Sequence, residues 1–104
     1  MIGLLMLAAA TITPVTFLHG NDLDGACRGA DVEPCTFYVV GAYDTIDLSQ
    51  QAKLTRKYIC LQPNVNISQM TDVFMKYIRD HPEKRHLLGT TLVSMSLEEA
   101  LPVP

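Results

Sequence analysis

The stretch from Asn66 to Arg79 constrains the fold of this chain most strongly. Its apolar residues recur at intervals of three and four, and they are Met70, Val73, Phe74, Tyr77 and Ile78. This spacing places them on one face of an α-helix. Asn66 and Gln69 form a capping-box-like pair at the start of the pattern. We therefore predict an amphipathic helix from about Ile67 to Arg79, whose apolar face must pack against other elements.

A second helix is predicted to begin near Pro34, which is tolerated in a first helical turn. One of its faces carries Cys35, Tyr38, Val39, Ala42 and Ile46. Because Phe37, Val40 and Tyr43 make the other side apolar too, we expect this helix to be central. Gly41 lies inside it, at a cost of about 1 kcal/mol relative to alanine. We interpret this glycine as a point where a neighbouring helix approaches closely.

Two further helices are predicted, a short one over about residues 21–28 and a last one over about residues 82–100. The last helix is expected to turn three apolar residues inward, namely Leu88, Leu92 and Met95. Residues 47–66 form a mixed, polar connection with at most one helical turn. No segment alternates convincingly between apolar and polar residues, so we predict an all-α fold. Its architecture is a small four-helix bundle-like domain with antiparallel neighbours, held by disulfide bonding.

The chain begins with an apolar run from Ile2 to Ile12, and Ala8-Ala9-Ala10 offers a small-x-small cleavage pattern. This predicts a signal peptide over residues 1–10, with an end no later than about residue 18, before a helical domain over residues 17–104. The alternative is a retained membrane anchor, although spanning a bilayer needs about 20 apolar residues. The expected location is the periplasm, with no membrane contact in the mature form.

Charge and motif spacing exclude several classes of function. The net charge of −3 argues against a nucleic-acid binder. The stretch from Gly20 to Asp31 superficially matches a calcium loop, but it lacks an oxygen side chain at its first position and a glutamate at its twelfth. We therefore expect no metal site, no cofactor and no enzymatic activity.

The chain has three cysteines, Cys27, Cys35 and Cys60. Their spacing matches no zinc motif, and no local signature pairs them with a histidine as a catalytic base. In an exported protein they are candidates for disulfide bonding. The odd number leaves the pairing open at this point.

Several motifs follow one another along the chain: FLHGNDLDGAC from Phe17 to Cys27, Cys35-x-x-Tyr38-x-x-Gly41, Ile59-Cys60-Leu61, His81-Pro82-Glu83-x-x-His86 and Ala100-Leu101-Pro102. In this order and spacing they resemble the bacterial type VI secretion amidase-immunity family, the Tai or Rap group. The resemblance implies an exported helical domain that binds a peptidoglycan amidase toxin and blocks its active site. It also implies a homodimer as one form of the protein.

The chain departs from the family pattern in two places. Phe37 stands where the second-helix motif usually has glycine, and Val103 follows Pro102 where members commonly end in Pro-Cys. The second departure implies that Cys27 has lost a C-terminal partner, which leaves Cys35 and Cys60 to pair. In the chain-entropy model, closing a loop of about 25 residues is worth roughly 3–4 kcal/mol.

An inhibitor that blocks an active site needs a protrusion that enters a cleft, and the chain offers two candidates. The favoured one is the polar connection, where apolar anchors lie among basic residues: Lys53, Leu54, Arg56, Lys57, Tyr58 and Leu61. The other is the corner over residues 79–86, with His81, Glu83, Arg85 and His86. A different class of function stays open, namely a periplasmic stress or holding protein that binds many clients weakly.

Overall fold

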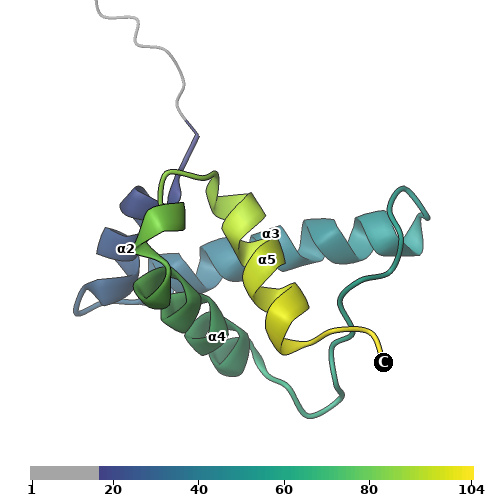
Figure 1. Cartoon of the computed structure of the whole chain (residues 1–104). Coiled ribbons are helices and arrows are strands. Elements are labelled where there is room, and N and C mark those ends of the chain that lie inside the picture. Colours follow the sequence, from purple (N-terminus) through teal and green to yellow (C-terminus); the bar gives the residue numbers. More distant parts are fainter. Residues whose placement is uncertain (1–16) are drawn as a thin grey trace, which may run out of the picture.

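A computed structural model describes residues 17–104, and all regular elements among them are helical (Figure 1). They are α2 (Gly20–Arg28), α3 (Glu33–Gln51), α4 (Ile67–Asp80), the 3-10 helix η1 (Pro82–Lys84) and α5 (Gly89–Ala100). The prediction of an all-α domain with four α-helices is confirmed. Within residues 17–104, none of the helices combines the length and the apolar character that a membrane span requires. The predicted signal peptide lies outside the described residues.

Helix α4 matches the sequence prediction to within one residue. The Asn66 side-chain oxygen accepts the Gln69 N–H at 2.9 Å, and the Gln69 side-chain oxygen accepts the Asn66 N–H at 2.8 Å. The predicted capping pair is thus present in both directions. Phe74 is 0% exposed and belongs to the core. Helix α4 packs against α3 and α5 (Figure 1).

Helix α3 is longer than the apolar pattern indicated, because it continues to Gln51 and includes the first residues of the predicted polar connection. Contacts between residues four apart support this extension, since the Ser49 hydroxyl donates to the Thr45 carbonyl at 2.9 Å. Residues of α3 after Ala42 are at most half-buried. The second half of α3 accordingly projects past the other helices (Figure 1).

The last helix begins at Gly89 and not near Pro82, so its predicted start is wrong. After η1 the chain turns and pairs with the segment that precedes α2. In this pairing the Gly89 N–H donates to the Leu18 carbonyl at 2.9 Å. A side chain at Gly89 would collide with Tyr38, so the close approach requires glycine. Leu92 is buried as predicted, whereas Leu88 is 43% exposed and lies outside the core.

The core is formed by the inner faces of all four α-helices and by one residue from the connection, Ile59. Ile59 is 1% exposed and forms an isolated antiparallel bridge with Pro102. Its neighbour Cys60 donates its N–H to the Leu101 carbonyl at 2.9 Å. The connection between α3 and α4 is therefore fixed to the C-terminal segment.

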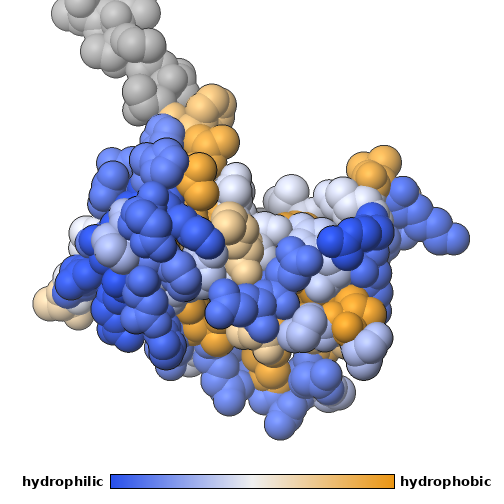
Figure 2. All heavy atoms as spheres, viewed as in Figure 1, coloured by the Kyte–Doolittle hydropathy of each residue, from blue (hydrophilic) through white to orange (hydrophobic). Residues whose placement is uncertain are grey.

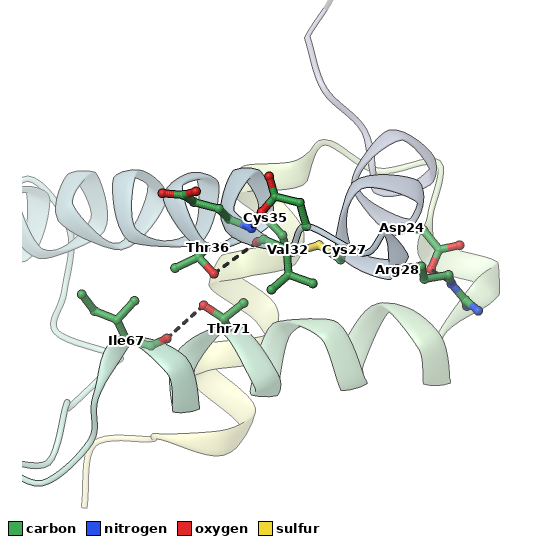
Figure 3. Close-up of a disulfide and its surroundings, with 10 residues drawn as sticks. Asp24, Cys27, Arg28, Val32, Cys35, Thr36, Ile67 and Thr71 are labelled. Atoms are coloured by element: carbon green, nitrogen blue, oxygen red, sulfur yellow. Dashed lines mark hydrogen bonds and ion pairs between the residues drawn. A yellow bond between two sulfur atoms is a disulfide. The ribbon is translucent and has the colours of Figure 1, made fainter.

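The disulfide joins Cys27 to Cys35, and Cys60 is a free, partly exposed thiol. The expected pairing of Cys35 with Cys60 is therefore wrong. The physical reason is local, because the two bonded cysteines flank the short α2–α3 connection and their Cα atoms lie 5.1 Å apart (Figure 3). Closing a loop with a sequence separation of 8 is worth about 2.5 kcal/mol in the chain-entropy model.

The sequence analysis interprets Gly41 as a point where a neighbouring helix approaches closely. This interpretation is wrong, because no other helix among the described residues lies against Gly41. Gly41 is exposed, and a Cβ atom built on it would meet no other atom within 4 Å.

Candidate partner-binding surface

Helix α3 ends in a Schellman motif, in which Lys53 occupies the position that glycine usually takes. The Lys53 N–H donates to the Gln50 carbonyl at 3.1 Å, and the Leu54 N–H donates to the Ser49 carbonyl at 2.9 Å. Lys53 has φ 59°, and among residues 17–104 it is the one non-glycine residue in the left-handed region. A side chain there costs about 1–2 kcal/mol relative to the right-handed conformation. The chain thus keeps a basic side chain at a position where glycine would be more stable.

The loop over residues 51–58 is closed at its base by the side chain of Gln50. The Gln50 side-chain oxygen accepts the N–H of Tyr58 at 2.9 Å and that of Ile59 at 3.0 Å. The amide nitrogen of the same side chain donates to the Ile59 carbonyl at 3.4 Å. One glutamine therefore joins the last turn of α3 to the far end of the loop, which makes it a compact Ω-type loop.

Two side chains attach the loop to α5. The hydroxyls of Tyr58 and Ser94 share a hydrogen bond at 2.9 Å. The Arg56 guanidinium lies 3.4 Å from the Glu98 carboxylate and 5.6 Å from the centre of the Tyr58 ring. Because the Arg56–Glu98 pair is exposed, its energy is small, and Tyr58 is the principal attachment.

The tip of the loop is exposed and combines an apolar side chain with positive charge. Leu54 is 78% exposed, and the basic residues around it, Lys53, Arg56 and Lys57, are exposed as well. No acidic residue occurs over residues 48–66. Figure 2 has the same view as Figure 1, and at the position of this loop it shows an apolar spot beside strongly hydrophilic atoms.

The six residues proposed for this surface therefore divide into two groups. Lys53, Leu54, Arg56 and Lys57 are exposed to a partner, whereas Tyr58 and Leu61 are partly buried and pack against the core. Gln50, which shapes the loop, was not identified from the sequence. Its role depends on contacts across nine residues, for which the sequence carries no local signal.

The second proposed surface, over residues 79–86, is used largely for internal contacts. The Arg85 guanidinium donates to the Ile78 carbonyl at 2.7 Å and to the Arg79 carbonyl at 3.3 Å. It thereby satisfies two of the carbonyls that the end of α4 leaves unpaired. His81 contacts the Tyr77 carbonyl through its ring nitrogen at 2.8 Å and stacks on the Tyr77 ring.

The other two residues of this corner, Glu83 and His86, are exposed. Lys84 lies beside them in the sequence and donates to the Tyr77 hydroxyl at 3.1 Å. This hydrogen bond raises the pKa of Lys84. Figure 1 shows the corner and the 51–58 loop at opposite ends of the domain, so the two candidate surfaces do not form one site.

The acidic residues of the stretch from Gly20 to Asp31 form contacts within or beside helices, and Asp31 accepts the Glu33 N–H at 3.0 Å at the start of α3. The Asp22 carboxylate accepts the His19 N–H at 2.9 Å at the start of α2, and Asp24 pairs with Arg28 at 2.7 Å one turn later. Within the described residues 17–104, histidine, cysteine, aspartate and glutamate side chains do not gather in groups of three that would suit a metal ion.

Comparison with known proteins assigns a family to the chain. Residues 19–103 match the family model of the Rap1a immunity proteins. No curated protein and no solved structure matches the chain. The matched segment begins just before α2, includes every helix among the described residues together with the 51–58 loop, and ends one residue after the Ile59–Pro102 bridge. Because the match covers most of the chain and the whole of the helical domain, the protein belongs to the family of Rap1a immunity proteins.

Proposed function

We propose that the protein is a periplasmic immunity protein that binds a cognate type VI secretion toxin and blocks it through the 51–58 loop. Membership of the family of Rap1a immunity proteins supports the binding of a toxin. We further propose that this toxin is a peptidoglycan amidase, as the resemblance implies. The observation that carries the choice of surface is the exposed, basic loop closed by Gln50.

A pre-organised loop is suited to the inhibition of an enzyme. Binding costs about 0.5–1.5 kcal/mol for each side chain that must be immobilised, and a loop already fixed at its base avoids part of the corresponding backbone cost. Leu54 supplies an apolar anchor for a cleft. Three basic residues around it attract a partner whose cleft has an acidic rim, which raises the association rate.

The disulfide supports the proposed location. Structural disulfides form and persist in oxidising compartments such as the bacterial periplasm, and Cys27–Cys35 joins α2 to α3 within the domain core. The proposed role is one of binding alone, which requires neither a cofactor nor a catalytic group.

The proposal is tested by measuring the affinity of peptidoglycan amidase toxins for three forms of the protein. The forms are the wild type, a loop variant with Lys53, Arg56 and Lys57 each changed to Glu, and a corner variant with Glu83→Lys and His86→Glu. We expect one amidase to bind the wild type and the corner variant equally, and the loop variant at least about a hundredfold more weakly. Equal affinity for the loop variant would refute the choice of surface.

A holding protein that binds many clients weakly is the second candidate function. The observation that favours it is the number of large apolar side chains on the surface, including Phe17, Phe37, Leu48, Leu54 and Ile67. Suppression of the aggregation of unrelated unfolded proteins distinguishes the two functions, because a dedicated immunity protein is expected to show none.

A further inference from the structure

A groove lies between α3, the connection over residues 59–66 and the first turn of α4. Its volume is about 520 Å³, which is within the range of sites that hold a ligand. Its lining is mostly apolar, and the apolar residues come from all three segments, namely Val40 and Tyr43, Leu61 and Val65, and Ile67 and Met70. Three separate segments of the chain thus build one apolar groove.

Part of this apolar lining is open to solvent. Ile67, the first residue of α4, is 52% exposed. Val40, Leu61 and Val65 are half-buried. Hydrophobic stabilisation is proportional to the apolar area removed from water, so these side chains contribute only part of what they can to the fold. A partner that covers the groove removes the remaining area from water.

The segments that build the groove carry acidic side chains and no basic ones. Residues 29–52 contain four acidic residues and residues 59–75 contain one, and neither range contains lysine, arginine or histidine. Asp44 lines the groove itself. It is exposed, and it forms no ion pair with another residue over 17–104. A cationic group is therefore the charge that complements the groove.

Tyr43 reports the sign of the electrostatic potential inside the groove. Burial raises the pKa of its hydroxyl, and the Asp47 carboxylate, the Cys60 thiol and the Asp44 carboxylate raise it further. The carboxylates have this effect because they oppose a negative charge on the tyrosine oxygen. The same carboxylates stabilise a positive charge that a partner brings to this place.

The groove and the 51–58 loop differ in charge. Asp44 precedes the last residue of α3, Gln51, by seven residues, which is about 10 Å along the helix axis at 1.5 Å per residue. The loop beyond it contains three basic residues and no acidic one. A cationic segment is therefore attracted to the groove and repelled by the loop, so the two surfaces select groups of opposite charge.

We propose that this groove binds a basic, apolar peptide segment of a partner protein. An aliphatic side chain of that segment lies against Ile67 and Val65, and a neighbouring lysine or arginine pairs with Asp44. The aliphatic side chain supplies the buried area, and the cation gives selectivity against acidic segments. The inference rests on the groove and its charges and does not depend on the identity of a toxin.

Nuclear magnetic resonance of the isotope-labelled protein tests the proposal with a defined probe. The probe is a capped peptide in which leucines alternate with arginines, and its two controls carry glutamate in place of arginine or serine in place of leucine. We expect the probe to shift the amide signals of Val40, Asp44 and Ile67 with a dissociation constant below about 1 mM. Each control peptide should bind at least about tenfold more weakly. Absence of binding, shifts confined to other surfaces, or equal binding of all three peptides would overturn the proposal.

Two charge variants locate the cation. Asp44→Lys is expected to weaken binding of the probe at least about tenfold, because it places a positive charge against the arginines. Glu83→Lys changes the net charge of the protein by the same amount at an exposed position outside the groove, and it should leave the affinity unchanged. Equal weakening by both variants would show that net charge alone governs binding and would contradict the proposal.

Two further variants locate the aliphatic side chain. Ile67→Ser removes apolar area from the groove and is expected to weaken binding about fivefold to tenfold. Leu88→Ser is the matched control, since Leu88 is also exposed, lies outside the groove and precedes a helix where serine is favoured. Equal affinity of Ile67→Ser and the wild type for the probe would refute the proposed seat.

Sedimentation equilibrium at the concentration of the titration identifies a different occupant, a second copy of the chain. We expect Asp44→Lys to leave the association state of the protein unchanged. A wild-type dimer that Asp44→Lys dissociates would show that a second copy fills the groove, and it would overturn the proposal.

Discussion

Replacing Gln50 with alanine removes the contacts that close the 51–58 loop. The N–H groups of Tyr58 and Ile59, which Gln50 accepts at 2.9 and 3.0 Å, lose their partner. Ile59 is 1% exposed, so water does not readily replace the lost acceptor. A buried donor left without a partner costs about 1–3 kcal/mol. We expect Gln50→Ala to lower the free energy of unfolding by about 2–4 kcal/mol.

Urea unfolding followed by circular dichroism measures this change, and thermal unfolding measures it independently. For a domain of this size, 1 kcal/mol corresponds to about 4–8 °C in the midpoint, so the midpoint is expected to fall by at least about 8 °C. Hydrogen exchange at the Tyr58 and Ile59 amides should accelerate in the same variant. Partner affinity should also fall, because the freed loop must be ordered on binding.

Two variants serve as controls. Gln51 is exposed and its side chain bonds only to the Asp47 carboxylate at 2.7 Å, so Gln51→Ala should change stability by less than about 0.5 kcal/mol. Gln50→Glu keeps an acceptor for both N–H groups and should retain more stability than Gln50→Ala. If Gln50→Ala is no more destabilising than Gln51→Ala, Gln50 does not close the loop.

Three further predictions concern the turn, the free thiol and pH. Lys53→Gly should raise the free energy of unfolding by about 1 kcal/mol in urea titrations, because glycine tolerates the left-handed conformation at no steric cost; a loss would refute this. In Val103→Cys the new thiol should form a disulfide with Cys60, so that a thiol titration detects no free thiol. The free energy of unfolding should rise by about 4 kcal/mol for a closed loop of this length. Two titratable thiols would contradict this prediction. A hydrogen bond from Lys76 lowers the pKa of the Asp80 carboxyl from its usual value, so the unfolded state binds the proton more readily. The Lys76–Asp80 pair therefore stabilises the fold above about pH 4, and this contribution is lost as the pH falls further. In Asp80→Asn the midpoint of urea unfolding should fall less steeply with decreasing pH than in the wild type. An unchanged dependence of the midpoint on pH would refute this prediction.

The elements that the sequence predicts well are those determined by local interactions. The cap at Asn66 and the apolar face ending at Ile78 lie within α4 itself, so pattern and structure agree. The start of α5 was misplaced because it depends on a distant partner. Gly89 pairs with Leu18 and packs against Tyr38, and no pattern near Pro82 reports those contacts.

The disulfide and the 51–58 loop also depend on contacts that no local sequence pattern reports. Family resemblance suggested a C-terminal partner for Cys27, whereas the structure places Cys60, not Cys27, beside the C-terminal segment through Leu101. The basic and apolar composition of the 51–58 loop was visible in the sequence, which is why it was selected as a candidate surface. Its shape was not, because Gln50 reaches across the loop to Ile59.

The most direct test of the central claim is a quantitative pull-down from a lysate of the source and co-resident bacteria. Wild-type protein, the loop variant with Lys53, Arg56 and Lys57 changed to Glu, and the corner variant with Glu83→Lys and His86→Glu are compared side by side. The account predicts one stoichiometric amidase-type toxin retained by the wild type and the corner variant and lost from the loop variant. Retention of that toxin by the loop variant, or many weakly bound proteins on all three forms, would contradict it.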